Sequence, residues 1–86
     1  MNGGEEARDV PRKTARRVLQ AAAVEAFGRP GVYVTQEGVM QRAAIVDLST
    51  FLRIAGYLEG RGWIAEADAD FSIFTVTAEG LDEAMR

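Results

Sequence analysis

The stretch 47–64, DLSTFLRIAGYLEGRGWI, decides how the rest of the chain is organised. At about 100° per residue, its apolar side chains fall on one broad arc and the others fall on the opposite side. The apolar arc holds Leu48, Phe51, Leu52, Ile54, Ala55 and Leu58, and the opposite side holds Ser49, Thr50, Arg53, Gly56 and Tyr57. The pattern predicts a helix with one face in a core and the other face free to meet a partner.

Both ends of this helix carry end signals. Asp47 is expected to cap the N-terminus, because its carboxylate can accept from the backbone N–H of Thr50 and complements the helix dipole. Gly60 and Gly62 are expected to end the helix. Trp63 and Ile64 lie outside the helical periodicity and are expected to begin a strand.

The length of 86 residues suits one domain, because a chain this short buries only about 60–65% of its unfolded surface. We expect a single domain over 9–86 after a disordered leader at 1–8, which is small, polar and charged. No apolar run approaches the roughly 18–20 residues that a membrane span needs, and the N-terminus lacks the apolar core of a secretory signal. We therefore expect a cytoplasmic protein without membrane contact.

Composition argues against several chemistries. The sequence has no Cys and no His, the usual nitrogen and sulfur ligands of transition metals. Asp68 and Asp70 alone make a poor calcium site. The chain has no glycine-rich phosphate loop and no carboxylate pair spaced for acid–base work, and Ser49 has no base near it in the sequence. We expect no metal, no cofactor and no enzymatic activity.

The net charge of −3 is unevenly distributed along the sequence. Residues 1–20 hold five basic and three acidic side chains, 21–62 hold four of each, and 63–86 hold one basic and six acidic ones. A basic front half can present a positive face to DNA, although the total charge gives no support to that idea.

The first helix is expected to follow a cap at Asp9, with Pro11 in its first turn. Its apolar stripe comprises Ala15, Val18, Leu19, Ala22, Ala23, Ala26 and Phe27. Its other face carries Arg8, Arg12, Lys13, Arg16, Arg17 and Gln20, either as a solvated face or as a contact for nucleic acid or a partner. The Gly and Pro residues of 28–31 are expected to stop it.

A short strand at 32–34 is expected next, followed by a helix over 36–43 with Thr35 as its cap. That helix would bury Val39, Met40 and Ala43, and Gly38 inside it costs about 1 kcal/mol relative to alanine. Residues 44–46 form the turn, with Ile45 between two helices.

Two runs of strand-forming residues, 63–67 and 71–77, flank a polar turn at 68–70 and predict a β-hairpin. By period 2, Ser72, Phe74 and Val76 face the core, whereas Phe71, Ile73 and Thr75 face outward. Exposed Phe71 and Ile73 indicate a partner interface or packing against the N-terminal helix or tail. Thr77 is expected to cap a last helix with Leu81 and Met85 inward.

Three fragments in this order carry a resemblance: VTQEGVMQRAAIVDLSTF, YLEGRGWI and FTVTAEG. The chain resembles the winged helix-turn-helix DNA-binding domains of small prokaryotic transcriptional regulators. The resemblance implies an α+β fold with a three-helix core, a two- to three-stranded β wing and a short C-terminal helix.

It also implies that the helix 47–61 lies in the major groove of double-stranded DNA, while the preceding helix and the wing touch the backbone. The implied contact residues are Gln36, Gln41, Arg42, Ser49, Thr50, Arg53 and Tyr57. Arg53 is the long donor suited to a guanine edge. The wing tip departs from the family, because Glu66, Asp68 and Asp70 stand where Arg or Lys is usual.

Two function classes follow. The first is a sequence-specific DNA-binding transcriptional regulator, expected to be a homodimer because one helix makes few contacts. The dimer interface would be the N-terminal helix or the face of Phe71 and Ile73. The alternative is a winged-helix protein–protein interaction module with little or no DNA affinity, which the acidic wing favours.

Overall fold

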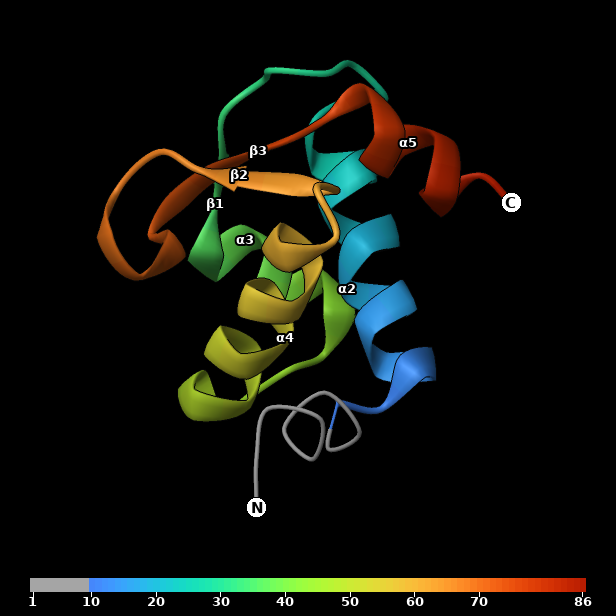
Figure 1. The fold of residues 1–86 in the computed structure, drawn as a ribbon. Helices are drawn as coiled ribbons and strands as arrows, with labels where there is room; N and C mark the ends of the chain where they lie inside the picture. Colours follow the sequence, from blue (N-terminus) through green and yellow to red (C-terminus); the bar gives the residue numbers. More distant parts are fainter. Residues whose placement is uncertain (1–9) are drawn as a thin grey trace.

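The computed structural model describes residues 10–86, which combine helices with a small sheet (Figure 1). The elements in order are α2 (Arg12–Glu25), β1 (Val34–Thr35), α3 (Gln36–Ala43), α4 (Leu48–Gly60), β2 (Ile64–Glu66), the 3₁₀ turn η1 (Ala69–Phe71), β3 (Ile73–Val76) and α5 (Ala78–Ala84). The predicted α+β class is confirmed. The expected leader at 1–8 and the cap at Asp9 lie outside the described residues, and Pro11 occupies the N-cap position of α2.

The sheet has the strand order β1-β3-β2, and both neighbouring pairs are antiparallel. Ile64 pairs with Val76 in the predicted hairpin, and Val34 pairs with Phe74 from the other edge. A short strand does follow the first helix, but it spans Val34–Thr35 and not the predicted 32–34, and it extends the hairpin to three strands. None of the helices within 10–86 has the length and apolar character needed to span a bilayer.

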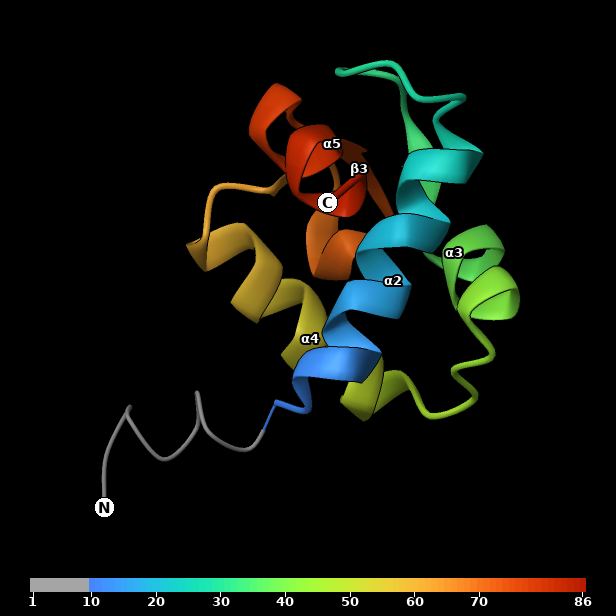
Figure 2. The ribbon, with the colours of Figure 1, turned by 90° about the vertical axis from the view of Figure 1, so that its right-hand side faces the viewer.

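The helices pack on one another and on the sheet around one core. Figure 2 shows α2 between α3 and α4, and α2 also contacts α5. The fully buried side chains come from all parts of this arrangement: Leu19 and Val18 of α2, Val39 of α3, Phe51, Ile54 and Leu58 of α4, and Phe74 and Val76 of β3. The Phe51 and Phe74 rings lie 6.1 Å apart, so α4 packs directly on the central strand.

Three predicted helix caps are confirmed. The Asp47 carboxylate accepts from the Thr50 N–H at 3.0 Å, and the Thr35 hydroxyl accepts from the Gly38 N–H at 3.1 Å. The Thr77 hydroxyl accepts from the Gly80 N–H at 2.9 Å. Each bond satisfies an N–H that has no partner within its own helix, so these residues fix where α3, α4 and α5 begin.

The predicted orientation of Phe71 is wrong. Phe71 is only 8% exposed, and its ring meets the Phe74 ring edge-on at 6.2 Å. Asp70 and Phe71 both have φ of 56°, so the chain turns through two left-handed residues before β3 begins. This turn breaks the period-2 alternation upstream of Ile73, which also leaves Ser72 exposed instead of buried.

Three other apolar residues were expected in the core and lie at the surface. Phe27 follows the end of α2 with φ of 57°, which carries its side chain out of the helical stripe. Leu48 is the first residue of α4, where the helix no longer packs on the core, and its side chain is 49% exposed. Met85 lies just after α5, where the short helix no longer covers the core.

The start of α5 is joined to the residues just before β2 by a close backbone contact. The Thr77 N–H donates to the Trp63 carbonyl at 3.0 Å, and the Thr77 hydroxyl donates to the Gly62 carbonyl at 2.7 Å. A Cβ at Gly80 would lie 2.0 Å from the Trp63 oxygen. Only glycine allows this approach of α5 to the sheet.

We predict that Gly80→Ala destabilises the fold by about 1–3 kcal/mol, because α5 must move away from Trp63 to admit the methyl group. Gly56→Ala is the matched control, since a Cβ there meets nothing within 4 Å. That control should gain about 1 kcal/mol from helix propensity. Urea unfolding of both variants measures the difference, and an unchanged Gly80→Ala midpoint would contradict the close contact.

Candidate nucleic-acid interface

The face of α4 directed away from the core is open. Because Phe51, Ile54, Ala55 and Leu58 are buried, the opposite side carries Ser49, Arg53, Gly56 and Gly60, which we name the outward face of α4. Within residues 10–86, the Arg53 side chain has no hydrogen-bond or ion-pair partner. The outward face therefore offers one long cationic donor beside small side chains.

The hydroxyl groups at the start of α4 are directed at Asp47. One carboxylate oxygen of Asp47 accepts from the Ser49 hydroxyl at 2.9 Å and from the Thr50 hydroxyl at 2.6 Å, in addition to the Thr50 N–H. The Thr50 and Ser49 hydroxyls, then the Thr50 N–H, lower the pKa of Asp47 below its ordinary value of 3.8, and Arg53 adds to the effect. Ser49 and Thr50 must give up these bonds to donate to a phosphate.

We predict that the Asp47 carboxylate makes part of the stability depend on pH. Since folding lowers its pKa, this contribution is present above pH 3.8 and is lost as pH falls through the lower folded value. Asp47→Asn retains a capping oxygen but carries no charge. Chemical unfolding should give wild type a larger free energy of unfolding than Asp47→Asn at about pH 6. The difference between the two free energies should shrink as the pH falls towards about 3. A difference that stays constant with pH would contradict the account.

Two of the residues predicted to contact DNA also hold elements of the domain together. The Gln36 side chain donates to the Asp70 carbonyl at 2.7 Å, and its backbone N–H donates to the Ser72 carbonyl at 3.0 Å. Arg42 forms an ion pair with Glu25 at 2.7 Å. Gln36 thus ties α3 to the hairpin turn, and Arg42 ties α3 to α2. Their DNA roles stay predictions, as does that of exposed Gln41.

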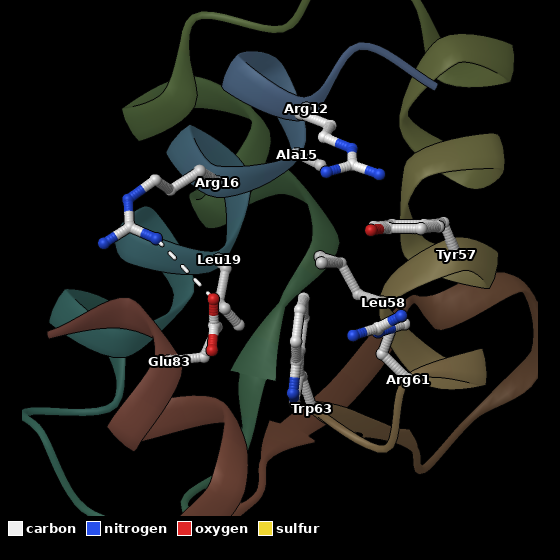
Figure 3. Close-up of a pocket in the computed structure, with 9 residues that line it drawn as sticks. All are labelled: Arg12, Ala15, Arg16, Leu19, Tyr57, Leu58, Arg61, Trp63 and Glu83. Carbon is white, nitrogen blue, oxygen red and sulfur yellow. Dashed lines mark ion pairs between the residues drawn. The ribbon is translucent and has the colours of Figure 1, made fainter. Parts of the chain in front are cut away.

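Tyr57 lies on the flank of α4 and not on its outward face. It is half-buried, and its ring meets the Trp63 ring edge-on at 6.4 Å. Figure 3 shows it across a cleft from α2. Tyr57 follows Arg53 by four residues, so the two are neighbours along α4, but the Tyr57 ring is engaged with Trp63 and the Arg53 side chain is exposed.

The polar face of α2 has a structural role that the sequence did not reveal. Arg17 donates to the Ala43 carbonyl at 2.8 Å, at the C-terminal end of α3. Arg16 pairs with Glu83 of α5 at 3.8 Å and donates to the Arg86 carbonyl, and Gln20 donates to the Ala84 carbonyl at 3.3 Å. Cationic and amide donors complement the free carbonyl groups of helix C-termini. The sequence does not indicate these contacts because the partners lie far apart along the chain.

Two acidic residues near the hairpin tip hold the turn. Glu66 accepts from the Phe71 N–H at 3.2 Å, and Asp68 accepts from the Ala69 N–H at 2.8 Å. Both carboxylates therefore stabilise the local turn, whether or not the hairpin tip meets a partner. The described part of the chain has no group of three or more His, Cys, Asp or Glu side chains placed to hold a metal ion.

Comparisons of the chain with protein-family models, with curated proteins and with solved structures gave no match. The case for a function therefore depends on the geometry of the chain itself.

Proposed function

We propose that the chain is a winged-helix, sequence-specific DNA-binding regulator of transcription in the cytoplasm, with α4 as its recognition helix. The order of elements supports this proposal: α3 and α4 follow one another across a four-residue connection, and the β2–β3 hairpin comes directly after α4. The observation that carries it is the outward face of α4, where Arg53 is exposed and unpaired among the described residues.

The chemistry of Arg53 suits a base edge in the major groove. A guanidinium can donate two parallel hydrogen bonds to guanine O6 and N7, which is worth about 1–3 kcal/mol of discrimination. Gln41 of α3 is exposed as well and has no side-chain hydrogen bond within 10–86, so it can donate to a phosphate. The DNA contacts then come from α4 and α3.

Gly56 is consistent with close approach of a partner to α4. It lies in the middle of the helix, where glycine costs about 1 kcal/mol relative to alanine, and its Cα faces open space. Within residues 10–86, no packing contact requires glycine there. A bare backbone at this position lets a groove wall come nearer than any side chain would.

The hairpin tip does not take part in this mode of binding. Glu66, Asp68 and Asp70 place three carboxylates at the tip, and like charges repel phosphates over the screening distance of about 8–10 Å. The wing therefore lies away from the DNA, which leaves α4 with few contacts and makes the interaction weak for a monomer.

We predict that Arg53→Ala lowers affinity about tenfold or more for a duplex selected from a random pool, because a bidentate contact is lost. Arg29→Ala is the matched control, an exposed arginine on the loop after α2. Fluorescence anisotropy from about 50 to 200 mM salt measures both, and wild-type affinity should fall steeply with salt. Equal losses for the two variants would refute the assignment of Arg53.

We also propose a homodimer through the outer face of the sheet, since two copies of α4 double the contacts. Ile73 faces outward as expected and is 36% exposed, and Tyr33 beside it is 72% exposed. Both line a shallow hollow with Ala67 and Asp68. Phe71 is buried and takes no part in the proposed interface.

Ile73→Asp should convert a dimer to a monomer, because a carboxylate would be buried against the apolar partner surface. Light scattering at about micromolar concentration measures the mass of wild type and variant. A dimer that survives Ile73→Asp places the interface elsewhere.

A second candidate function is a protein-interaction module that uses the same helix. Val46, just before α4, is 97% exposed, and Leu48 is 49% exposed. The two side chains form a small apolar surface at the N-terminal end of α4. Apolar side chains at a helix tip favour a protein groove over phosphates. A well-folded sample that fails to bind duplex DNA at about 50 mM salt would favour this function.

A further inference from the structure

A cleft of about 260 Å³ opens between α2, the end of α4, the start of β2 and α5 (Figure 3). Its floor is apolar and is made by Ala15, Leu19 and Leu58, which are all buried. Two aromatic side chains, Tyr57 and Trp63, form one side of it. This combination of an apolar floor with aromatic walls is typical of a pocket for a flat apolar group.

The rim of the cleft is cationic. Arg61 lies over the Trp63 ring, with its guanidinium carbon 4.9 Å from the ring centroid. Arg12 reaches from α2 towards Tyr57 across the mouth of the cleft (Figure 3). Among residues 10–86, neither Arg12 nor Arg61 has an acidic partner.

The one carboxylate of the lining is already engaged. Glu83 pairs with Arg16 at 3.8 Å and with Arg86 at 3.2 Å. Arg16 is directed at Glu83 and the end of α5, so it balances that charge. Within the part of the chain that the structure describes, Arg12 and Arg61 are then the cations of the cleft without an acidic partner. Among the described lining residues, an anionic group at the rim would meet two guanidinium groups and no unpaired carboxylate.

We propose that this cleft binds a small aromatic carboxylate. The ring would lie on Leu19 and Leu58 against the Tyr57 and Trp63 rings, and the carboxylate would accept from Arg12 and Arg61. The volume suits one ring, because a cavity of roughly 150 Å³ already holds benzene. Guanidinium groups bind carboxylates through paired N–H donors and stack on aromatic faces, so both parts of such a ligand have partners.

Trp63 supplies a direct readout, because the chain contains one tryptophan. Benzoate is titrated into ¹⁵N-labelled protein while the indole N–H signal of Trp63 is followed by NMR. Benzamide tests the charge and cyclohexanecarboxylate tests the aromatic ring. Benzoate should bind saturably and about tenfold more tightly than either analogue, since each analogue lacks one of the two interactions.

Arg61→Gln and Arg12→Gln should each weaken benzoate binding about fivefold to tenfold, because both guanidinium groups meet the carboxylate. Arg29→Gln lies outside the cleft and should leave the affinity unchanged. Arg12 and Arg61 are both exposed, so the variants should fold, which circular dichroism verifies. Equal shifts by benzoate and benzamide, or no saturation up to about 20 mM, would overturn the proposal.

The ligand proposal and the DNA proposal are tested by separate experiments on different residues. Arg53 and the outward face of α4 take no part in the benzoate titration, and Arg12 and Arg61 do not enter the Arg53→Ala comparison. A failure to bind DNA would not contradict the ligand site, and a failure to bind benzoate would not contradict the DNA proposal.

Discussion

The packing of Phe51 against Phe74 is the contact on which the rest of the structure depends. Both rings are fully buried, and their centroids lie 6.1 Å apart. Because Phe51 faces the central strand, the direction of every other side chain of α4 is fixed by helical geometry. Arg53 and Gly56 must then face outward. Burial of two phenylalanines, each worth about 1.5–3 kcal/mol, thus determines which surface α4 can offer to a partner.

A second layer of polar contacts fixes how the elements around this core are placed. Arg17 holds the end of α3, Arg16 and Gln20 hold the end of α5, and Gln36 holds the hairpin turn. In each case a side chain of one element bonds to a group on another element, mostly a backbone carbonyl. A ligand that met these side chains would compete with the bonds they already make within the domain. The contacts leave Arg53 on one side of α4, and Arg12 and Arg61 on the cleft side, as cations without acidic partners among the described residues.

Much of the fold could be predicted from sequence because its signals are local. Helical periodicity identified most of the buried residues of α2 and α4, although it missed Ala21, and the side-chain chemistry of Thr35, Asp47 and Thr77 identified three helix starts. The errors arose where backbone conformation interrupts a period, as in the left-handed pair Asp70 and Phe71 and at Phe27. The roles of Gln36 and Arg42 were missed for another reason: their partners, Asp70 and Glu25, are 34 and 17 positions away. Nothing in the local sequence indicates such a bond.

The central claim is that α4 presents its outward face, and the hairpin tip does not, to DNA. Amide chemical shifts of ¹⁵N-labelled protein, recorded while a short duplex is added at about 50 mM salt, test it directly. The account predicts that the largest shifts fall on the amides of Ser49, Arg53 and Gly56, with little change over residues 66–70. Largest shifts at the hairpin tip, or none anywhere in a folded sample, would contradict it.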